Sequence, residues 1–212
     1  MTPIPSPMRL AVFASGGGSN LGAILESIDA GDLGATVCVV VTDRGGIGAL
    51  DRARARNIPT ATLAPADLPD DAAFADALLD VLAGHRTDAV ALAGYLKKIP
   101  VPVLETYRHR VLNVHPSLLP AFGGPGLYGA RVHRAVLDYG AKVSGATVHL
   151  VDAEYDTGPV VLQEPVPVLP DDTPHSLAAR VLRAEHAIYP RALALLADGR
   201  LSLDGRRVRI DP

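Results

Sequence analysis

The sequence has little cysteine and no long hydrophobic run. Its one cysteine, Cys38, has no partner for an internal disulfide and lies in an apolar stretch, which fits a small core residue in a reducing compartment. The N-terminal segment 1–8 is rich in proline without an apolar core, so it is expected to be flexible and is neither a signal peptide nor a membrane anchor. No later run approaches the roughly 20 residues that span a bilayer. These absences predict a cytoplasmic protein without a membrane partner.

The sequence also lacks linkers, internal repeats and low-complexity tracts. A chain of 212 residues without a Ser- or Gly-rich linker is expected to form a single domain, 1–212. The formal net charge is -3 and the basic residues are scattered, which disfavours a nucleic-acid partner and favours small-molecule substrates. The composition is compatible with a monomer or a homodimer.

Short apolar runs alternate with helical patterns through the first half of the chain. The expected strands are 9–14, 36–41, 58–63 and 89–93, and the expected helices begin at Leu21, after Gly46 and at Asp71. The β-branched run 36–41 is typical of a strand buried on both faces. The alternation predicts an α/β fold with a Rossmann-like, mostly parallel sheet, helices on both faces, and ligands beyond the carboxyl ends of the strands.

The second half of the chain adds further elements. They are a helix at 130–139, strands at 144–152 and 160–168, a long helix at 173–196 and a hairpin at 201–210. Prolines in the second strand indicate an edge position. We expect Pro190 to interrupt the long helix and Asp204-Gly205 to form the turn of the hairpin.

The segment 113–120, Asn-Val-His-Pro-Ser-Leu-Leu-Pro, places an amide and an imidazole at the end of an apolar run. On a strand, Asn113 and His115 point to the same face. Pro116 favours extended geometry at His115, and Pro120 stiffens the following turn. A neutral donor beside a titratable donor suits the stabilisation of negative charge on a carbonyl oxygen.

The glycine loop 16–20 lies between the first expected strand and helix. Backbone amides at a helix N-terminus, with Ser19 and Asn20, suit an anion. A dinucleotide fingerprint requires glycine where Leu21 stands, and a Walker loop requires Lys followed by Ser or Thr. Asp43 keeps open the alternative of a ribose-binding acid in a dinucleotide fold, and a tight turn without ligand is another. The favoured ligand is a phosphomonoester.

An acidic loop at 152–159 follows an expected strand at the same sheet edge. A carboxylate from this loop near His115 is expected to raise the pKa of that imidazole, as a general acid or proton relay requires. His149 is a candidate for supporting the site. The other histidines considered are expected to be solvated: His85, His109, His133 and His175. No spacing indicates a metal site, and Gly-x-Ser-x-Gly, which would mark a serine nucleophile, is absent.

Several ordered motifs together resemble one family, the phosphoribosylglycinamide formyltransferases. The resemblance covers nearly the whole chain. The motifs are Ser-Gly-Gly-Gly-Ser-Asn-Leu at 15–21, Leu-Ala-Gly-Tyr at 92–95, the segment 113–120, the run 145–151 with Asp-Thr-Gly-Pro at 156–159, and Glu-His-Ala-Ile-Tyr-Pro at 185–190.

The resemblance implies the formyltransferase fold and transfer of a formyl group from the cosubstrate 10-formyltetrahydrofolate to the amine of glycinamide ribonucleotide, in purine synthesis and without a metal. Asn113 and protonated His115 would stabilise a tetrahedral oxyanion, and Asp156 would hold His115 charged and assist proton transfer.

The resemblance also implies the binding residues. Gly18, Ser19 and Asn20 would bind the substrate phosphate, and Glu185 the ribose. The folate would contact Leu96, Lys97, Lys98, Ile99, Asn113 and Asp152, with the loop 152–156 over the pterin. Residues 9–95 would form a phosphate-binding half and 96–212 a folate-binding and catalytic half.

The chain departs from the family pattern in two places. Some members carry a folate-associated arginine near Asp71, where this sequence is acidic, with Asp67 and Asp70 nearby. The loop 122–129 is longer than in some members.

Other functions remain as alternatives. Methionyl-tRNA formyltransferase would need a tRNA-binding domain and a basic surface, and formyltetrahydrofolate deformylase usually has an additional regulatory domain. A non-catalytic nucleotide-binding module or a nicotinamide oxidoreductase would use the glycine loop and Asp43 but leave Asn113 and His115 without a role.

Overall fold

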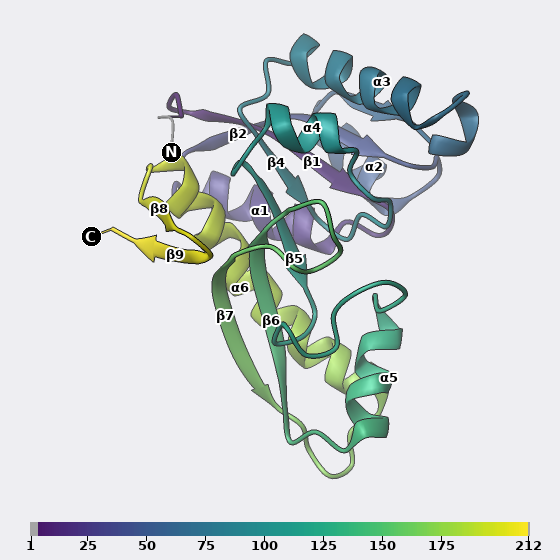
Figure 1. The fold of residues 1–212 in the computed structure, drawn as a ribbon, viewed down its shortest axis with the longest axis vertical. Helices are drawn as coiled ribbons and strands as arrows, with labels where there is room; N and C mark the ends of the chain where they lie inside the picture. The colour runs from purple at the N-terminus through teal and green to yellow at the C-terminus, as the bar shows by residue number, and fades with distance from the viewer. Residues whose placement is uncertain (1–3, 212) are drawn as a thin grey trace.

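The structure is a computed structural model that describes residues 4–211 (Figure 1). The helices are α1 (Ser19–Asp29), α2 (Gly48–Ala55), α3 (Asp71–Gly84), α4 (Val101–Thr106), α5 (Ala130–Tyr139) and α6 (Pro174–Ala197), with a 3-10 turn at Pro65–Asp67. The strands are β1 (Met8–Ala14), β2 (Ala35–Thr42), β3 (Thr60–Thr62), β4 (Ala89–Leu92), β5 (Val111–His115), β6 (Val143–Leu150), β7 (Val160–Pro167), β8 (Leu201–Asp204) and β9 (Arg207–Ile210). Residues 1–3 of the segment expected to be flexible lie outside the described part. No helix within 4–211 is both long and apolar enough to cross a membrane.

A seven-stranded sheet in the order β3-β2-β1-β4-β5-β6-β7 forms the centre of the molecule (Figure 1). The pairings among β1 to β5 are parallel, whereas β6 pairs antiparallel with both β5 and β7. The prediction of a mostly parallel α/β sheet is confirmed, and β7 lies at an edge as its prolines indicate. β8 and β9 form a separate two-stranded hairpin.

Helices cover both faces of the sheet because its strands are apolar on both sides. In β1, Leu10 and Val12 belong to one buried cluster, and Ala11 and Phe13 belong to the other. The first cluster includes side chains of α1, α2, α5 and α6, and the second includes those of α3 and α4. The side chains along the central strands are therefore committed to the core on both faces, and the side chains available for function lie at the strand ends.

Two expectations about the C-terminal third need correction. Pro190 does not interrupt α6, which continues from Pro174 to Ala197. Proline removes one helical hydrogen bond, but the flanking turns are buried against the sheet, and that packing maintains the helix. The hairpin forms as expected, yet Asp204 pairs with Arg207, so the turn consists of Gly205 and Arg206. The short helix α4 was not predicted.

Tyr189 of α6 links the two strands that lead to the site. Its side chain is 0% exposed, and its hydroxyl lies 3.1 Å from the Leu92 carbonyl of β4 and 3.0 Å from the Leu112 carbonyl of β5. We expect Tyr189→Phe to lower the free energy of unfolding by about 1–3 kcal/mol, because it leaves buried acceptors unsatisfied. Urea unfolding would measure this. Tyr139→Phe, at a side chain 81% exposed, is the control, and equal stability of the two variants would contradict the prediction.

Candidate active site

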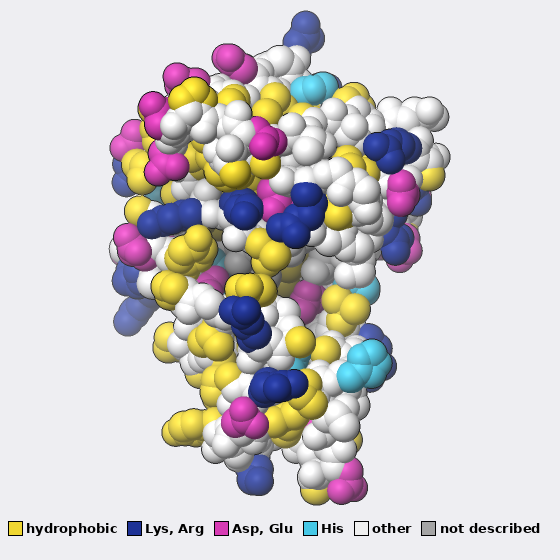
Figure 2. All heavy atoms as spheres, turned by 90° about the vertical axis from the view of Figure 1, so that its right-hand side faces the viewer, with side chains coloured by type: hydrophobic (Ala, Val, Ile, Leu, Met, Phe, Trp, Pro, Cys, Tyr) yellow, Lys and Arg dark blue, Asp and Glu magenta, His cyan; other side chains and the backbone are white. Residues whose placement is uncertain are grey.

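A cavity of about 300 Å³ opens where β4 and β5 end. Its lining residues come from the segment after β4, the end of β5, the loop before α5, and the loop between β6 and β7. Figure 2 shows this side of the molecule hollowed near its middle, with Lys and Arg side chains gathered above the hollow. Parallel strands bring their carboxyl ends to one edge of a sheet, which is where ligands bind in such folds.

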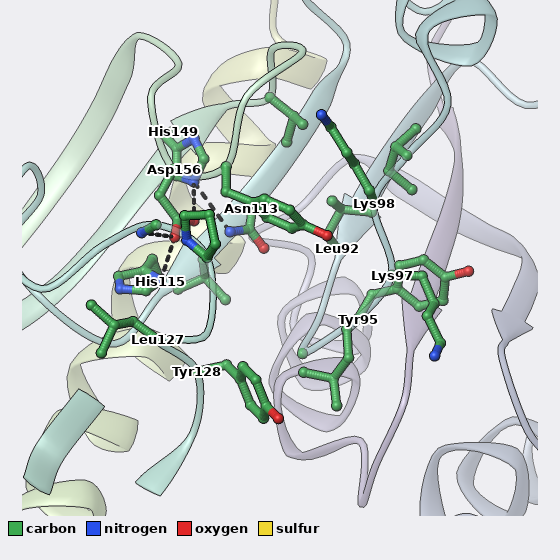
Figure 3. Close-up of a pocket in the computed structure, with 18 of the residues that line it drawn as sticks. Leu92, Tyr95, Lys97, Lys98, Asn113, His115, Leu127, Tyr128, His149 and Asp156 are labelled. Carbon is green, nitrogen blue, oxygen red and sulfur yellow. Dashed lines mark hydrogen bonds and ion pairs between the residues drawn. The ribbon is translucent and has the colours of Figure 1, made fainter. Parts of the chain in front are cut away.

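Asn113 and His115 both line this cavity from β5 (Figure 3). The antiparallel register of β5 and β6 places His149 directly opposite Asn113. His149 Nδ1 lies 3.0 Å from the Leu150 carbonyl, an acceptor, so this nitrogen donates. With the proton on Nδ1, Nε2 accepts a hydrogen bond from Asn113 Nδ2 at 3.1 Å. This contact orients the Asn113 amide.

Asp156 approaches both imidazoles from the loop between β6 and β7 (Figure 3). Its Oδ2 lies 3.5 Å from His115 Nδ1, and its Oδ1 lies 3.7 Å from His149 Nε2. The Gly124 N–H donates to Oδ2 at 2.8 Å. Burial raises the pKa of Asp156, but the hydrogen bonds and the charges of both imidazoles outweigh it and lower the pKa below its ordinary value. Asp156 is therefore a carboxylate at neutral pH.

The pKa of His115 is lowered from its ordinary value, although the Asp156 carboxylate acts in the expected direction and raises it. Burial is the largest cause and outweighs the charge of Asp156 and the hydrogen bond to the Phe122 carbonyl, both of which raise the pKa; the charge of His149 lowers it further. His115 is therefore mainly neutral at neutral pH. Its Nε2 donates to the Phe122 carbonyl at 2.9 Å, so Nδ1 of the neutral ring turns a lone pair toward Asp156.

The segment expected to contact folate lies in the wall of the same cavity. The lining includes all four of its residues, Leu96 to Ile99, together with Asp152 and residues 124–129 of the long glycine loop. Lys98 Nζ lies 3.8 Å from Glu154 and 5.8 Å from the centre of the Tyr155 ring. One side of the cavity therefore combines a lysine paired with a glutamate and an aromatic ring.

The acidic stretch near Asp71 lies beside this wall. Asp71 lines an adjoining cavity together with Lys97 and Lys98. Asp70 accepts a hydrogen bond from the Ala73 N–H and so caps α3. The cations in this part of the site come from the segment after β4.

Asp43 is not available for a ribose. Its side chain is 1% exposed, pairs with Arg44 at 2.7 Å and lies 3.8 Å from Lys97 Nζ. Burial raises the pKa of Asp43, but the hydrogen bonds and the charge of Arg44 outweigh it and lower the pKa. This removes the main support for a dinucleotide-binding site.

The glycine loop and Glu185 meet at the N-terminus of α1, outside the cavity lining. Asn20 Nδ2 donates to Glu185 Oε2 at 2.7 Å, although the two residues are 165 positions apart. Gly18 has φ 72 and packs against α2: a Cβ there would lie 2.8 Å from the Ala49 Cα. Ser15 Oγ accepts from the Leu96 N–H at 3.0 Å and joins this loop to the cavity wall.

Glu185 should make stability depend on pH. Burial raises its pKa from 4.5 to about 7, against the hydrogen bond from Asn20, which lowers it. Between these values the folded chain keeps a proton that the unfolded chain releases, so this stabilisation is complete below pH 4.5 and is lost as the pH rises to 7. Glu185→Gln should remove a difference of roughly 2 kcal/mol between pH 5 and pH 7.5, measured by urea unfolding. Glu105→Gln, at an exposed side chain, is the control. An unchanged pH dependence in Glu185→Gln would contradict the prediction.

The remaining histidines include one correction. His133 was expected to be solvated, but it is 4% exposed on α5, because this helix packs against α6. His175 is exposed, and His85 and His109 are half-buried. In the part of the chain that the structure describes, no group of three or more His, Cys, Asp or Glu side chains is arranged to hold a metal ion.

Comparison with known proteins identifies the family. Residues 8–193 match the family described as formyl transferase. The chain is 44% identical to the chloroplastic phosphoribosylglycinamide formyltransferase of Arabidopsis thaliana over 93% of this chain and 68% of that protein. It is 38% identical to the phosphoribosylglycinamide formyltransferase of Escherichia coli over 95% of this chain and 96% of that protein.

A solved structure agrees with these matches. The crystal structure of glycinamide ribonucleotide transformylase 1 from Symbiobacterium toebii superimposes with a TM-score of 0.92 at 44% identity, over 97% of this chain and 94% of that one. The resemblance found in the sequence is therefore confirmed, and so is the fold class. The chain belongs to the formyl transferase family.

Proposed function

We propose that this enzyme transfers a formyl group from 10-formyltetrahydrofolate to the amine of 5'-phosphoribosylglycinamide, in de novo purine synthesis. The observation that carries the proposal is the convergence of Asn113, His115 and Asp156 in one cavity. Relatives of this chain are named phosphoribosylglycinamide formyltransferase, after the same reaction. An amide donor, an imidazole and a carboxylate suit acyl transfer, because negative charge develops on the formyl oxygen when the amine attacks.

The proposed mechanism assigns each side chain one task. Asn113 uses one amide hydrogen for His149 and directs the other to the oxyanion. The amine that attacks the formyl carbon gives up a proton, which passes by way of Asp156 to Nδ1 of His115, and Asp156 stabilises the resulting imidazolium. The Nε2–H of His115 then leaves the Phe122 carbonyl and donates a hydrogen bond to the oxyanion. Asp156 and His115 return a proton to the folate nitrogen that leaves.

The binding roles are further parts of the proposal. The N–H groups of Gly18, Ser19 and Asn20 suit the substrate phosphate because they lie at the N-terminus of α1, and Glu185 beside them suits the ribose. We assign the folate to the wall formed by Leu96, Lys97, Lys98 and Ile99, with Asn113 and Asp152.

The chain thus divides by function. Residues 9–95 mainly bind the phosphate, and 96–212 mainly bind the folate and supply catalysis. Its partners are these small molecules, without a metal, nucleic acid or membrane, and it acts as a monomer or homodimer. We place it in the cytoplasm, although plant relatives are named chloroplastic.

Gly18→Ala tests the phosphate site. We expect KM for the ribonucleotide to rise roughly tenfold to a hundredfold, because the new methyl group pushes the loop from Ala49 and misaligns charge-assisted hydrogen bonds. Steady-state kinetics with varied ribonucleotide would show it. Gly31→Ala is a matched control, since Gly31 also has a positive φ, +80, but no neighbouring atom within 4 Å. Equal KM values in the two variants would reject the assignment.

A transfer assay tests the function as a whole. The purified chain is mixed with 10-formyltetrahydrofolate with and without the ribonucleotide, and formate, tetrahydrofolate and formylated ribonucleotide are quantified. Formylation that requires the ribonucleotide supports the proposal. Release of formate without the ribonucleotide would indicate a deformylase, and absence of both reactions would reject a formyl-folate enzyme.

A further inference from the structure

The loop that carries Asp156 contacts the C-terminal hairpin. Arg206, in the turn between β8 and β9, donates from Nη2 to the Thr157 carbonyl. The hairpin also packs on β7, the strand that follows the loop (Figure 1). Arg206 and Asp156 line a second cavity, of about 620 Å³. The hairpin is therefore adjacent to the site, although it contributes nothing to the first cavity.

The backbone at Asp156 needs support from its surroundings. Asp156 has φ 58, which lies in the left-handed region of backbone conformation that residues other than glycine adopt uncommonly. Such a residue keeps its conformation only where neighbouring contacts determine it. The position of its carboxylate relative to His115 thus depends on how the loop is held.

The loop is also held by a hydrogen bond within it and by close contact with β6. Thr157 Oγ1 donates to Asp152 Oδ1 at 2.7 Å and closes the loop on itself. Gly158 lies so close to β6 that a Cβ there would be 1.7 Å from the Leu150 carbonyl oxygen. The carbonyl of Thr157, the residue after Asp156, accepts a hydrogen bond from Arg206. Among the described residues, Arg206 is the one hairpin side chain that makes a hydrogen bond to this loop.

We propose that Arg206 is a positioning residue for the formyl transfer: by binding the Thr157 carbonyl it holds the Asp156 carboxylate in line with His115. This inference rests on the proposed function. Arg206 acts through the loop and touches neither substrate. A guanidinium suits the task because it presents several donors in a fixed plane.

The test compares three variants of the full chain. Arg206→Ala removes the contact. Arg206→Lys retains the positive charge and a hydrogen-bond donor on a shorter side chain. Arg207→Ala removes an equal charge from the next position, whose side chain is exposed. For Arg206→Ala we expect a fall in kcat of about tenfold, as misplacement of a catalytic group causes, with KM for both substrates within twofold. Arg206→Lys should recover part of kcat, and Arg207→Ala should match wild type.

The titration of His115 separates positioning from simple stabilisation. Asp156 faces His115 directly, and His149 and His133 are its other titratable neighbours. A displaced carboxylate raises the pKa of His115 less, so the NMR-detected titration of His115 should move to lower pH in Arg206→Ala and stay unchanged in Arg207→Ala. A melting temperature close to wild type is expected for both.

Two results would overturn the inference. One is a kcat and a His115 titration in Arg206→Ala equal to those of Arg207→Ala. The other is a lower melting temperature in Arg206→Ala with unchanged kcat per folded enzyme. Both are distinct from failure of the proposed function, in which wild type itself would not formylate the ribonucleotide.

Discussion

Replacing His115 by alanine should lower kcat by about a hundredfold to ten-thousandfold, the usual contribution of a positioned acid or base. The imidazole lies in the cavity 3.5 Å from the Asp156 carboxylate, which stabilises the positive charge that His115 acquires beside Asn113 when it takes up a proton. Without it, neither the oxyanion nor the departing folate nitrogen has a proton donor of suitable pKa. Single-turnover measurement of formyl transfer would separate this loss from weaker binding.

Two other histidines make the result interpretable. His133→Ala removes an equally buried imidazole from α5 that does not line the cavity, and so reports the cost to folding. His175→Ala, at an exposed position, should behave as wild type. A folded His115→Ala variant that retains more than about a tenth of wild-type kcat would lose far less activity than removal of an acid–base residue causes. That result would show that His115 is not the catalytic imidazole, and it would leave the assigned reaction unchanged.

Replacing Asn113 by alanine should lower kcat by about a hundredfold to a thousandfold, as loss of one oxyanion donor does. The amide is oriented by the hydrogen bond to His149 Nε2 at 3.1 Å, so it needs no rearrangement when charge develops. The interaction strengthens in the transition state, and KM for the folate should therefore change little. Steady-state kinetics with both substrates varied would measure this.

Asn113→Asp is the matched variant for this position. It keeps the volume of the side chain but replaces the donor with an acceptor, so it should be at least as impaired as Asn113→Ala. Near-normal kcat in Asn113→Asp would show that the side chain fills space and donates nothing to the oxyanion. Unfolding curves of both variants would confirm that the β5 end is still folded.

The central fold was predictable because its signals are local. A run such as Thr36 to Val41 is apolar on both faces, and this alone indicates a parallel strand between two layers of helices. The edge position of β7 followed from its prolines. The continuity of α6 through Pro190 was not predictable, because it depends on burial against strands that lie far away in the sequence.

The sequence by itself determined that Asn113 and His115 share one face at the end of a buried strand, because strand geometry has a period of two. It also determined the family, through motifs at fixed spacing. Only the tertiary structure decided that His149 orients Asn113, since this contact depends on the register of an antiparallel pair. Only the tertiary structure decided the pKa of His115, because the carboxylate, the Phe122 carbonyl and the degree of burial come from loops that meet in the folded chain. A pKa is a balance of hydration against neighbouring charges, and both depend on the packing around the group.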